Sequence, residues 1–362
     1  MSFSRFEIRA ARAGDAPAIF EVARHLNSVN LPANLQRLER SLAHSDASFA
    51  GKVSNFKESE YIFVAVEHGD HGDPGEPGSA ERIVGCSMIF AQLGRRGAPY
   101  IYLDVLPEER YSSTIDRHVR HTTLKIGYSY DGPTELGGLA LLPEYRKSPE
   151  QLGLCLSAAR FLYIRAHRAL FQDELLAELM PPLKPDGSSA LWDSLGAAFT
   201  GMSYEEADKL SRENKEFIRG LFPELPIHAS LLSKDAQAAI GQVGPAAARA
   251  RELLTRIGFR YADRIDPFDG GPHYTALTDS VSYVRETQPV HVHAHEGLMH
   301  SDTVMVAVVT SVAPYFRMIR TQGIVRDRAT AYLRASAMQA LGAEDGDSAW
   351  VLATSEIPAS YP

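Results

Sequence analysis

The chain has 362 residues, which exceeds what one small core needs and predicts two domains or one domain with a large insertion. The globular composition, 44% hydrophobic and 23% charged, includes no membrane-spanning apolar run and no signal peptide, so we expect a soluble, cytoplasmic protein. The formal net charge of −8 argues against nucleic acid as the main ligand, because phosphate binding needs a concentrated basic face, and it favours a cationic substrate.

The first predicted elements are a strand and two helices. Residues 6–9 alternate in polarity as a strand does. A helix begins after Asp15, a favourable N-cap residue, and Pro17 suits the first helical turn. A second, amphipathic helix is predicted over residues 35–42.

Two β-patterned runs, residues 61–67 and 82–90, predict a pair of antiparallel strands. The connection between them is rich in Gly, Pro, Asp, Glu and His, which is typical of a loop, and its His68 is expected to face solvent. A third strand is predicted near residues 100–106, followed by a polar segment over residues 107–123.

The most informative segment is an apolar strand at residues 135–142, followed by a Pro-Glu-Tyr-Arg corner and a helix that starts near Gly153. An exposed helix N-terminus offers unpaired N–H groups and a positive dipole end to phosphate oxygens, and Arg146 and Lys147 add charge. The segment therefore indicates a phosphate-containing ligand. The alternative is that the basic pair lies on a solvated loop and that Gly153 relieves helix crowding.

The second half of the chain mixes helices and strands. Residues 175–179 either extend the preceding helix or form the next strand. Residues 191–199 and 250–261 each look like a helix that is stopped by glycine before an aromatic residue enters a strand. The last portion is β-patterned, so we predict one region of residues 1–290 and a small β-rich region of residues 291–362.

Cysteines and histidines give little sign of a metal. Cys86 and Cys155 lie in apolar contexts, which predicts buried, reduced thiols. One metal-like cluster consists of His291, His293, His295 and His300 with Glu296. The first three would share one face of a strand, a geometry that can bind zinc or nickel, but an exposed linker is the other interpretation. We expect no metal.

Several stretches occur in the order of one known family and cover most of residues 30–275. The most specific are an Ile-Gly-Gln-Val run at residues 240–243 and a Phe-Asp-Gly-Gly-Pro run at residues 268–272. Other matching stretches are residues 31–34, 135–139, 142–147, 191–196 and 258–261. On these motifs the chain resembles the bacterial arginine N-succinyltransferases, some of which also act on ornithine. Its strand, corner and helix resemble the acyl-CoA site of the GNAT class of acyltransferases.

The resemblance implies an α/β (α+β) fold, with a GNAT-like mixed sheet flanked by helices and a C-terminal β-rich appendage. It implies transfer of a succinyl or related acyl group from succinyl-CoA to the α-amine of arginine, or of a related amino acid such as ornithine, in arginine catabolism. A homo- or hetero-oligomer is expected, and neither nucleic acid nor a membrane is an expected partner. The alternative is a weak or inactive paralogue that acts as a regulatory partner subunit or as an acyl-CoA sensor.

The same resemblance implies where the acyl-CoA binds. Leu139 matches a family position that contacts the acyl-CoA, and Gly138 beside it would let the pantetheine approach the backbone closely. Arg146, Lys147 and Gly153 are the expected contacts of the diphosphate.

An arginine acceptor calls for carboxylates near its guanidinium, which favours planar two-point contacts. Asp266 and Asp269, with Glu135 behind them, are the predicted acceptor-binding residues. The alternative for the two aspartates is a tight turn in which they bond their own backbone.

The chain departs from the family at the proton donor. The family motif Ile-Gly-Gln-Val is followed by a histidine, the expected donor, and this chain has Gly244 there. His228 is the candidate for a displaced catalytic histidine, and the alternative is that it is a packed loop residue.

Overall fold

The computed structural model describes residues 5–25, 34–69, 81–95, 98–211, 214–297 and 301–353. It has a mixed α/β fold, as the sequence predicts. The chain forms two compact units: unit 1 contains the described residues up to Ala91, Leu136–Phe171 and those from Asp279 onward, and unit 2 contains Gln92–Glu135 and Gln172–Thr278. The division into residues 1–290 and 291–362 stays a prediction. Within the described part of the chain, no helix combines the length and the apolar character needed to cross a bilayer.

The strands of unit 1 follow the order β12-β15-β11-β14-β13-β1-β2-β3-β6. The strand bounds are β1 Phe6–Ala10, β2 Glu60–His68, β3 Glu81–Phe90, β6 Thr134–Leu141, β11 Gln288–Ala294, β12 Asp302–Val309, β13 Phe316–Arg326, β14 Thr330–Leu333 and β15 Ser348–Ala353. The helix bounds are α1 Ala16–Ala23, α2 Leu35–Phe49, α3 Leu152–Ala166, α9 Ser282–Glu286 and α10 Ala335–Leu341.

The C-terminal strands of unit 1 close on themselves. Because β12 pairs with β13 as well as with β15, the strands β11 to β15 form a ring. Valines of β11, β12 and β15 fill its core, and α10 adds Met338 and Leu341. The predicted β-rich C-terminal appendage is confirmed.

Helices α1 and α2 pack on β2 and β3 around Ile19, Val22 and Leu42. α2 begins after Asn34, whose Oδ1 accepts the N–H of Arg37 at 3.0 Å, and it runs further than the sequence predicts. α3 is buried over most of its length because apolar residues occur all around it.

Asp15 precedes α1 as predicted, but its side chain does not cap the helix. Its carboxylate accepts hydrogen bonds from Nη1 and Nη2 of Arg9, at 2.7 and 3.1 Å, and from the backbone N–H of Arg12 at 2.7 Å. The Arg9 side chain is 1% exposed. Asp15 is therefore half of a buried ion pair that joins β1 to the start of α1.

His68 does not face solvent, contrary to the prediction. Its Nε2 lies 3.5 Å from Oε2 of the buried Glu7. Burial alone would raise the pKa of Glu7, but its contact with His68 and the charges of Arg317 and Arg9 more than offset this and lower it. The ion cluster around Glu7 therefore favours the ionised carboxylate.

Stability is expected to fall in acid partly through Glu7. A carboxyl whose folded pKa is lowered contributes stability that is complete above its unfolded pKa and is lost as the pH falls through the folded value. The unfolding free energy of the unaltered chain minus that of Glu7→Gln should therefore shrink from about pH 5 downward. Urea unfolding at several pH values measures this difference, and a difference that stays constant with pH contradicts the assignment.

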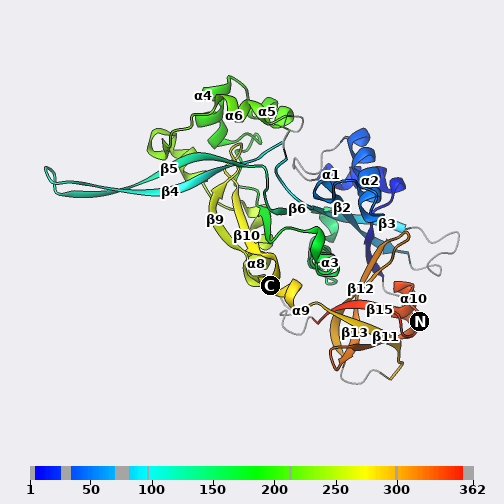
Figure 1. Ribbon diagram of the computed structural model, residues 1–362. Helices are drawn as coiled ribbons and strands as arrows, with labels where there is room; N and C mark the ends of the chain where they lie inside the picture. Colours follow the sequence, from blue (N-terminus) through cyan, green and yellow to red (C-terminus); the bar gives the residue numbers. More distant parts are fainter. Residues whose placement is uncertain are drawn as a thin grey trace. The chain divides into compact units, whose positions relative to one another are not determined.

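Unit 2 is built on antiparallel strands in the order β7-β10-β9-β4-β5-β8. The strand bounds are β4 Tyr100–Ser112, β5 Arg117–Ser129, β7 Glu174–Glu178, β8 Ile227–His228, β9 Arg260–Ile265 and β10 Pro272–Leu277. The helix bounds are α4 Ala197–Thr200, α5 Tyr204–Ser211, α6 Glu216–Leu221, α7 Lys234–Ala239 and α8 Ala248–Ile257. Figure 1 shows β4 and β5 as a long hairpin, which contains most of the polar segment 107–123.

Two glycine stops have different outcomes. Gly258 ends α8 with φ 114°, as predicted. The predicted stop at Gly196 is wrong, because this glycine lies inside a helical turn that continues through α4 to Gly201, where φ is 69°. Gly196 is instead required by packing, since a Cβ there would lie 2.3 Å from the ring of Trp192.

Candidate functional site

The strand β6 carries a local irregularity at Gly138. This residue has φ 58°, a left-handed conformation, and a Cβ there would lie 2.5 Å from Sδ of Met88. The thiol of Cys86 donates a weak hydrogen bond to the carbonyl of Gly138, with Sγ 3.6 Å from the oxygen. The next residue, Leu139, is half-buried. The strand therefore needs glycine at position 138, which is predicted to lie beside the pantetheine.

Replacement of Gly138 by alanine is expected to lower the unfolding free energy by about 1–3 kcal/mol, because the new Cβ meets both an unfavourable φ and Met88. Gly153 in α3 is the matched control. A Cβ there makes ordinary contact with Cδ1 of Leu141 at 3.5 Å, so Gly153→Ala should be neutral or stabilise by up to about 1 kcal/mol. Urea unfolding of both variants checks this, and equal effects would contradict it.

The corner after β6 is a short turn over Pro143–Tyr145, and Arg146 folds back from it. Its Nε donates to the carbonyl of Leu141 at 3.2 Å and its Nη2 donates to the carbonyl of His25 at 3.3 Å. Lys147 is exposed. Arg146 therefore ties the turn to the end of β6 and to His25, just after α1, in addition to contributing charge.

Helix α3 begins after Gln151, which has φ 55° and makes no side-chain hydrogen bond to the first turn. The N–H groups of Leu152 and Gly153 have no intrahelical partner, because the first N–H groups of any helix lack one. An uncapped first turn next to Arg146 and Lys147 is the arrangement in which helix N-termini bind phosphate.

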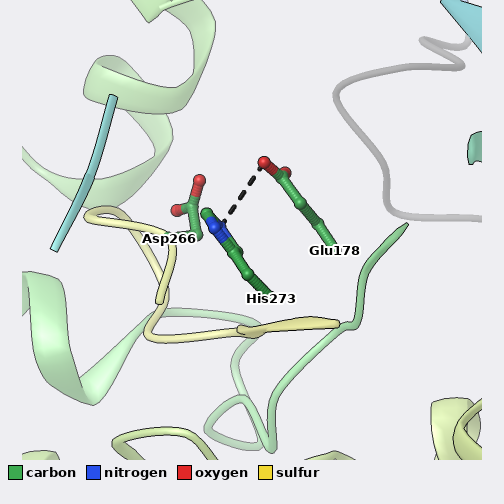
Figure 2. Close-up of side chains that lie close together, drawn as sticks. All are labelled: Glu178, Asp266 and His273. Atoms are coloured by element: carbon green, nitrogen blue, oxygen red, sulfur yellow. Dashed lines mark ion pairs between the residues drawn. The ribbon is translucent and has the colours of Figure 1, made fainter. Parts of the chain in front are cut away.

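In unit 2, three side chains converge at the end of β7 and the start of β10. His273 of β10 pairs across the strands with Glu178 of β7, and its Nε2 lies 3.5 Å from Glu178 Oε1. Asp266, just after β9, faces the same point, so that one ligand atom of each residue lies within 4.8 Å of the others. Figure 2 shows the three side chains converging from separate segments.

The two sides of His273 differ. On one side Nδ1 makes a 2.7 Å hydrogen bond with the hydroxyl of Tyr100 in β4. On the other side Nε2 is buried and makes no hydrogen bond to any residue that the structure describes, since Glu178 Oε1 at 3.5 Å is at the limit of such a bond. The whole residue is 0% exposed, whereas the Glu178 side chain is 32% exposed, so the cluster opens toward solvent at Glu178.

The charges of this cluster are poorly balanced. Burial and the nearby Glu178 raise the pKa of Asp266 to about 6, and burial raises the pKa of Glu178 as well. Burial lowers the pKa of His273 to about 4, so its imidazole is neutral at pH 7. Two carboxyl groups beside a neutral imidazole make a site that favours a positively charged ligand.

Two of the predicted acceptor-binding residues, Asp266 and Asp269, lie in a turn, and the third, Glu135, is a buried strand residue. Asp266 Oδ1 accepts the backbone N–H groups of Phe268 and Asp269, at 2.7 and 3.2 Å, and Asp269 Oδ1 accepts the N–H of Gly271 at 2.7 Å. Burial and the charge of Asp266 raise the pKa of Asp269 well above its ordinary range. Glu135 is 5% exposed, on the β6 end that pairs with β7.

Sequence reasoning missed Glu178 and His273. His273 directly follows the Phe-Asp-Gly-Gly-Pro motif and could have been noticed there. Glu178 could not have been recognised from the sequence, because only the register between β7 and β10 places it opposite His273.

His228 lies away from this cluster. It occupies the edge strand β8, and β5, β4 and β9 separate β8 from β10 in the strand order. Its Nε2 is 3.5 Å from Oε2 of Glu108, its ring meets His121 edge to face at 5.5 Å, and its side chain is 39% exposed.

Gly244 lies against the segment that follows β7. Its N–H donates to the carbonyl of Met180 at 2.8 Å, and a Cβ there would lie 2.6 Å from the carbonyl oxygen of Pro181. The position therefore has no room for a side chain without movement of residues 180–181.

The remaining sequence candidates have structural partners. His291 and His293 lie on strand β11 and not in a linker. His291 Nδ1 hydrogen-bonds to the carbonyl of Gly346 and His293 Nδ1 to Asp345, both at 3.0 Å. His300 lies outside the residues that the structure describes. Cys86 and Cys155 are free and buried as predicted, and burial raises the pKa of each thiol to about 12.

Comparison with known proteins identifies the family. The family model described as arginine N-succinyltransferase beta subunit matches residues 6–283. The chain belongs to this family. It is 33% identical to the arginine N-succinyltransferase subunit beta of Pseudomonas aeruginosa over 284 residues, which are 78% of this chain and 79% of that relative. It is 32% identical to the arginine N-succinyltransferase of Photorhabdus laumondii, over 94% of this chain and 95% of that one.

A solved structure of the arginine/ornithine succinyltransferase subunit AI from Pseudomonas aeruginosa has the same fold. The TM-score is 0.78 at 26% identity, and the match covers 97% of this chain and 99% of that chain. The predicted family and its fold class are therefore confirmed.

Proposed function

We propose that the chain is an N-acyltransferase that moves a succinyl or related acyl group from an acyl-CoA to the α-amine of arginine or ornithine, in arginine catabolism. The observation that carries this proposal is the family match over residues 6–283. Succinyl-CoA is the proposed donor. The oligomer and the cytoplasmic location stay predictions.

The proposed acyl-CoA site lies along β6 and the start of α3 in unit 1. Met88 fills the space beside Gly138, so the proposal for the pantetheine rests on the half-buried Leu139 and on the left-handed backbone at Gly138, which interrupts the regular strand there. The first turn of α3, which includes Gly153, has no side-chain cap, so its free N–H groups are the proposed contacts of the diphosphate. Arg146 and Lys147 would supply positive charge.

The proposed acceptor site lies in unit 2, at the turn after β9 and the end of β7. Asp266 and Asp269, with the buried Glu135, provide negative charge for a cationic amino acid, and Glu178 adds a carboxylate that is open to solvent. Burial is the main reason why the pKa values of Glu178, Asp266 and Asp269 are raised, and a bound cation would favour the ionised form of each carboxyl group.

The reaction forms a C–N bond and breaks the C–S bond, and one proton leaves the amine nitrogen as the sulfur departs with its electron pair. A thiolate is a good leaving group, so correct positioning and backbone N–H groups near the developing oxyanion supply much of the rate. His228 is the candidate proton donor, and His228→Gln should lower kcat by at least about 100-fold if it acts in this way.

The experiment is an assay of free CoA with succinyl-CoA as donor and arginine, ornithine or lysine as acceptor. Release that requires an acceptor and yields the succinylated amino acid supports the proposal. Binding of succinyl-CoA with no transfer to any of the three would instead favour an acyl-CoA sensor or a regulatory subunit.

A further inference from the structure

The cluster of Glu178, Asp266 and His273 offers three separate hydrogen-bond acceptors to one point. Each comes from a different segment, β7, the turn after β9, and β10, so the strand pairing fixes the directions from which they approach. Glu178 supplies the open side of the cluster and His273 supplies its buried floor.

His273 is the observation that calls for a ligand. A buried polar atom without a partner is uncommon, because leaving it unsatisfied costs about 1–3 kcal/mol. Nε2 of His273 is such an atom, and it points at the two carboxyl groups. When Nδ1–H donates to the hydroxyl of Tyr100, Nε2 carries a lone pair and is ready to accept one N–H.

Asp266 also offers one contact. Its Oδ1 already accepts two backbone N–H groups, which uses both lone pairs of that oxygen and leaves Oδ2 for a ligand. A guanidinium prefers two parallel contacts to both oxygens of one carboxylate, and Asp266 cannot provide them. The site is therefore better matched to a donor with three single N–H bonds.

We propose that Glu178, Asp266 and His273 bind a primary ammonium group of the acceptor, one N–H to each residue; this rests on the proposed function. Three acceptors placed about 2.8 Å from a tetrahedral nitrogen lie about 4.6 Å apart. The three atoms lie within 4.8 Å of one another, a limit that admits this separation, and the shorter Glu178–His273 distance of 3.5 Å would need a rotation of the partly exposed Glu178 side chain.

The surrounding charges fit this assignment. Lys215, directly before α6, lies near enough that its charge lowers the pKa of Glu178, Asp266 and His273, so it competes with a bound cation for the cluster. Arg264 of β9 is paired with Asp104, with Nε 3.1 Å from Oδ1, and its charge also helps to lower the pKa of His273, which keeps the imidazole neutral. We therefore expect Lys215→Met to strengthen ligand binding, because a competing charge is removed.

The test is calorimetry on the full chain without acyl-CoA, using probes that carry one cation each. Nα-acetylornithine has a side-chain ammonium, norvaline has an α-ammonium, and Nα-acetylarginine has a guanidinium. Binding of either ammonium probe supports the proposal and tells which amine of the acceptor occupies the cluster. Binding of Nα-acetylarginine alone, of Zn²⁺ in place of the ammonium probes, or of none of them at millimolar concentration overturns it.

Variants link the binding to the cluster. Glu178→Gln and His273→Gln should each weaken binding of the ammonium probe at least about tenfold, as expected for loss of one charge-assisted hydrogen bond. Glu174→Gln, a carboxylate on the same strand β7, is the matched control and should leave affinity unchanged. Should His273→Gln fail to fold, the partly exposed Glu178→Gln decides the question. Unchanged affinity in Glu178→Gln overturns the proposal.

The two proposals fail separately. Ammonium binding that depends on Glu178, without acyl transfer to any acceptor, refutes the transferase proposal and leaves this site standing. Acyl transfer at an unchanged acceptor KM in Glu178→Gln refutes this site and leaves the transferase proposal standing.

Discussion

Gly244→His is expected to lower the unfolding free energy by about 1–3 kcal/mol and to leave acyl transfer no faster. The resemblance to the family predicts a histidine at this position, so the substitution would be the obvious attempt to restore a proton donor. In this chain, however, a Cβ at 244 would lie 2.6 Å from the carbonyl oxygen of Pro181 and 2.8 Å from its carbonyl carbon. Both atoms belong to the backbone and cannot rotate away as a side-chain tip can.

The N–H of Gly244 adds to this cost, because it donates to the carbonyl of Met180 at 2.8 Å and a displaced backbone would break that bond. Gly14→His is the matched control, since a Cβ there has nothing within 4 Å. Urea unfolding and CoA release are measured on both variants. Unchanged stability together with a rate gain of about 100-fold or more would contradict the account and show that residues 180–181 move aside.

Asp15→Ala is expected to cost about 3 kcal/mol of unfolding free energy, the lower end of what removing one partner of a buried ion pair costs. It leaves the guanidinium of Arg9, which is 1% exposed, without its two-point partner in the interior. The backbone N–H of Arg12 loses its acceptor as well. Glu81 and Glu7 stay near the guanidinium, with Nη2 3.2 Å from Glu81 Oε2 and Nε 3.8 Å from Glu7 Oε1. The lost contact is the buried two-point one, so the loss should still exceed what a surface ion pair contributes.

Glu144→Ala is the control for Asp15→Ala. Glu144 pairs with Arg82 at 2.9 Å, but both side chains are more than half exposed, and such pairs contribute at most about 1 kcal/mol. Denaturant unfolding compares the two variants, and similar losses would show that burial of Arg9 does not set the energy. A double variant, Arg9→Met with Asp15→Leu, should recover part of the loss because it removes both charges together.

Hydrophobic patterns predicted those elements of the fold that bury one continuous stretch of sequence. The apolar run that became β6 and the apolar helix α3 were found because each buries a continuous stretch of its own sequence. The hairpin of β4 and β5 was missed beyond residue 106 because its outer part is exposed on both faces and carries no apolar alternation. Asp15 was found as the start of α1, but its pairing with Arg9 depends on how β1 lies beside the helix.

The site was only partly accessible from the sequence for the same reason. Asp266 and Asp269 stand in a recognisable motif, whereas Glu178 and Tyr100 reach His273 only through the pairing of strands that are distant in sequence. His228 was a candidate because of its residue type, and its edge-strand position separates it from the carboxylate cluster. The steric barrier at Gly244 depends on the path of residues 180–181, which no sequence pattern specifies.

The most direct test of the central claim is release of CoA from succinyl-CoA by the purified full chain in the presence of arginine or ornithine. The account predicts release that depends on the amino acid, with one succinylated product formed per CoA. Succinyl-CoA that remains intact with arginine, ornithine and lysine alike, under conditions in which the chain is folded and binds CoA, would contradict it.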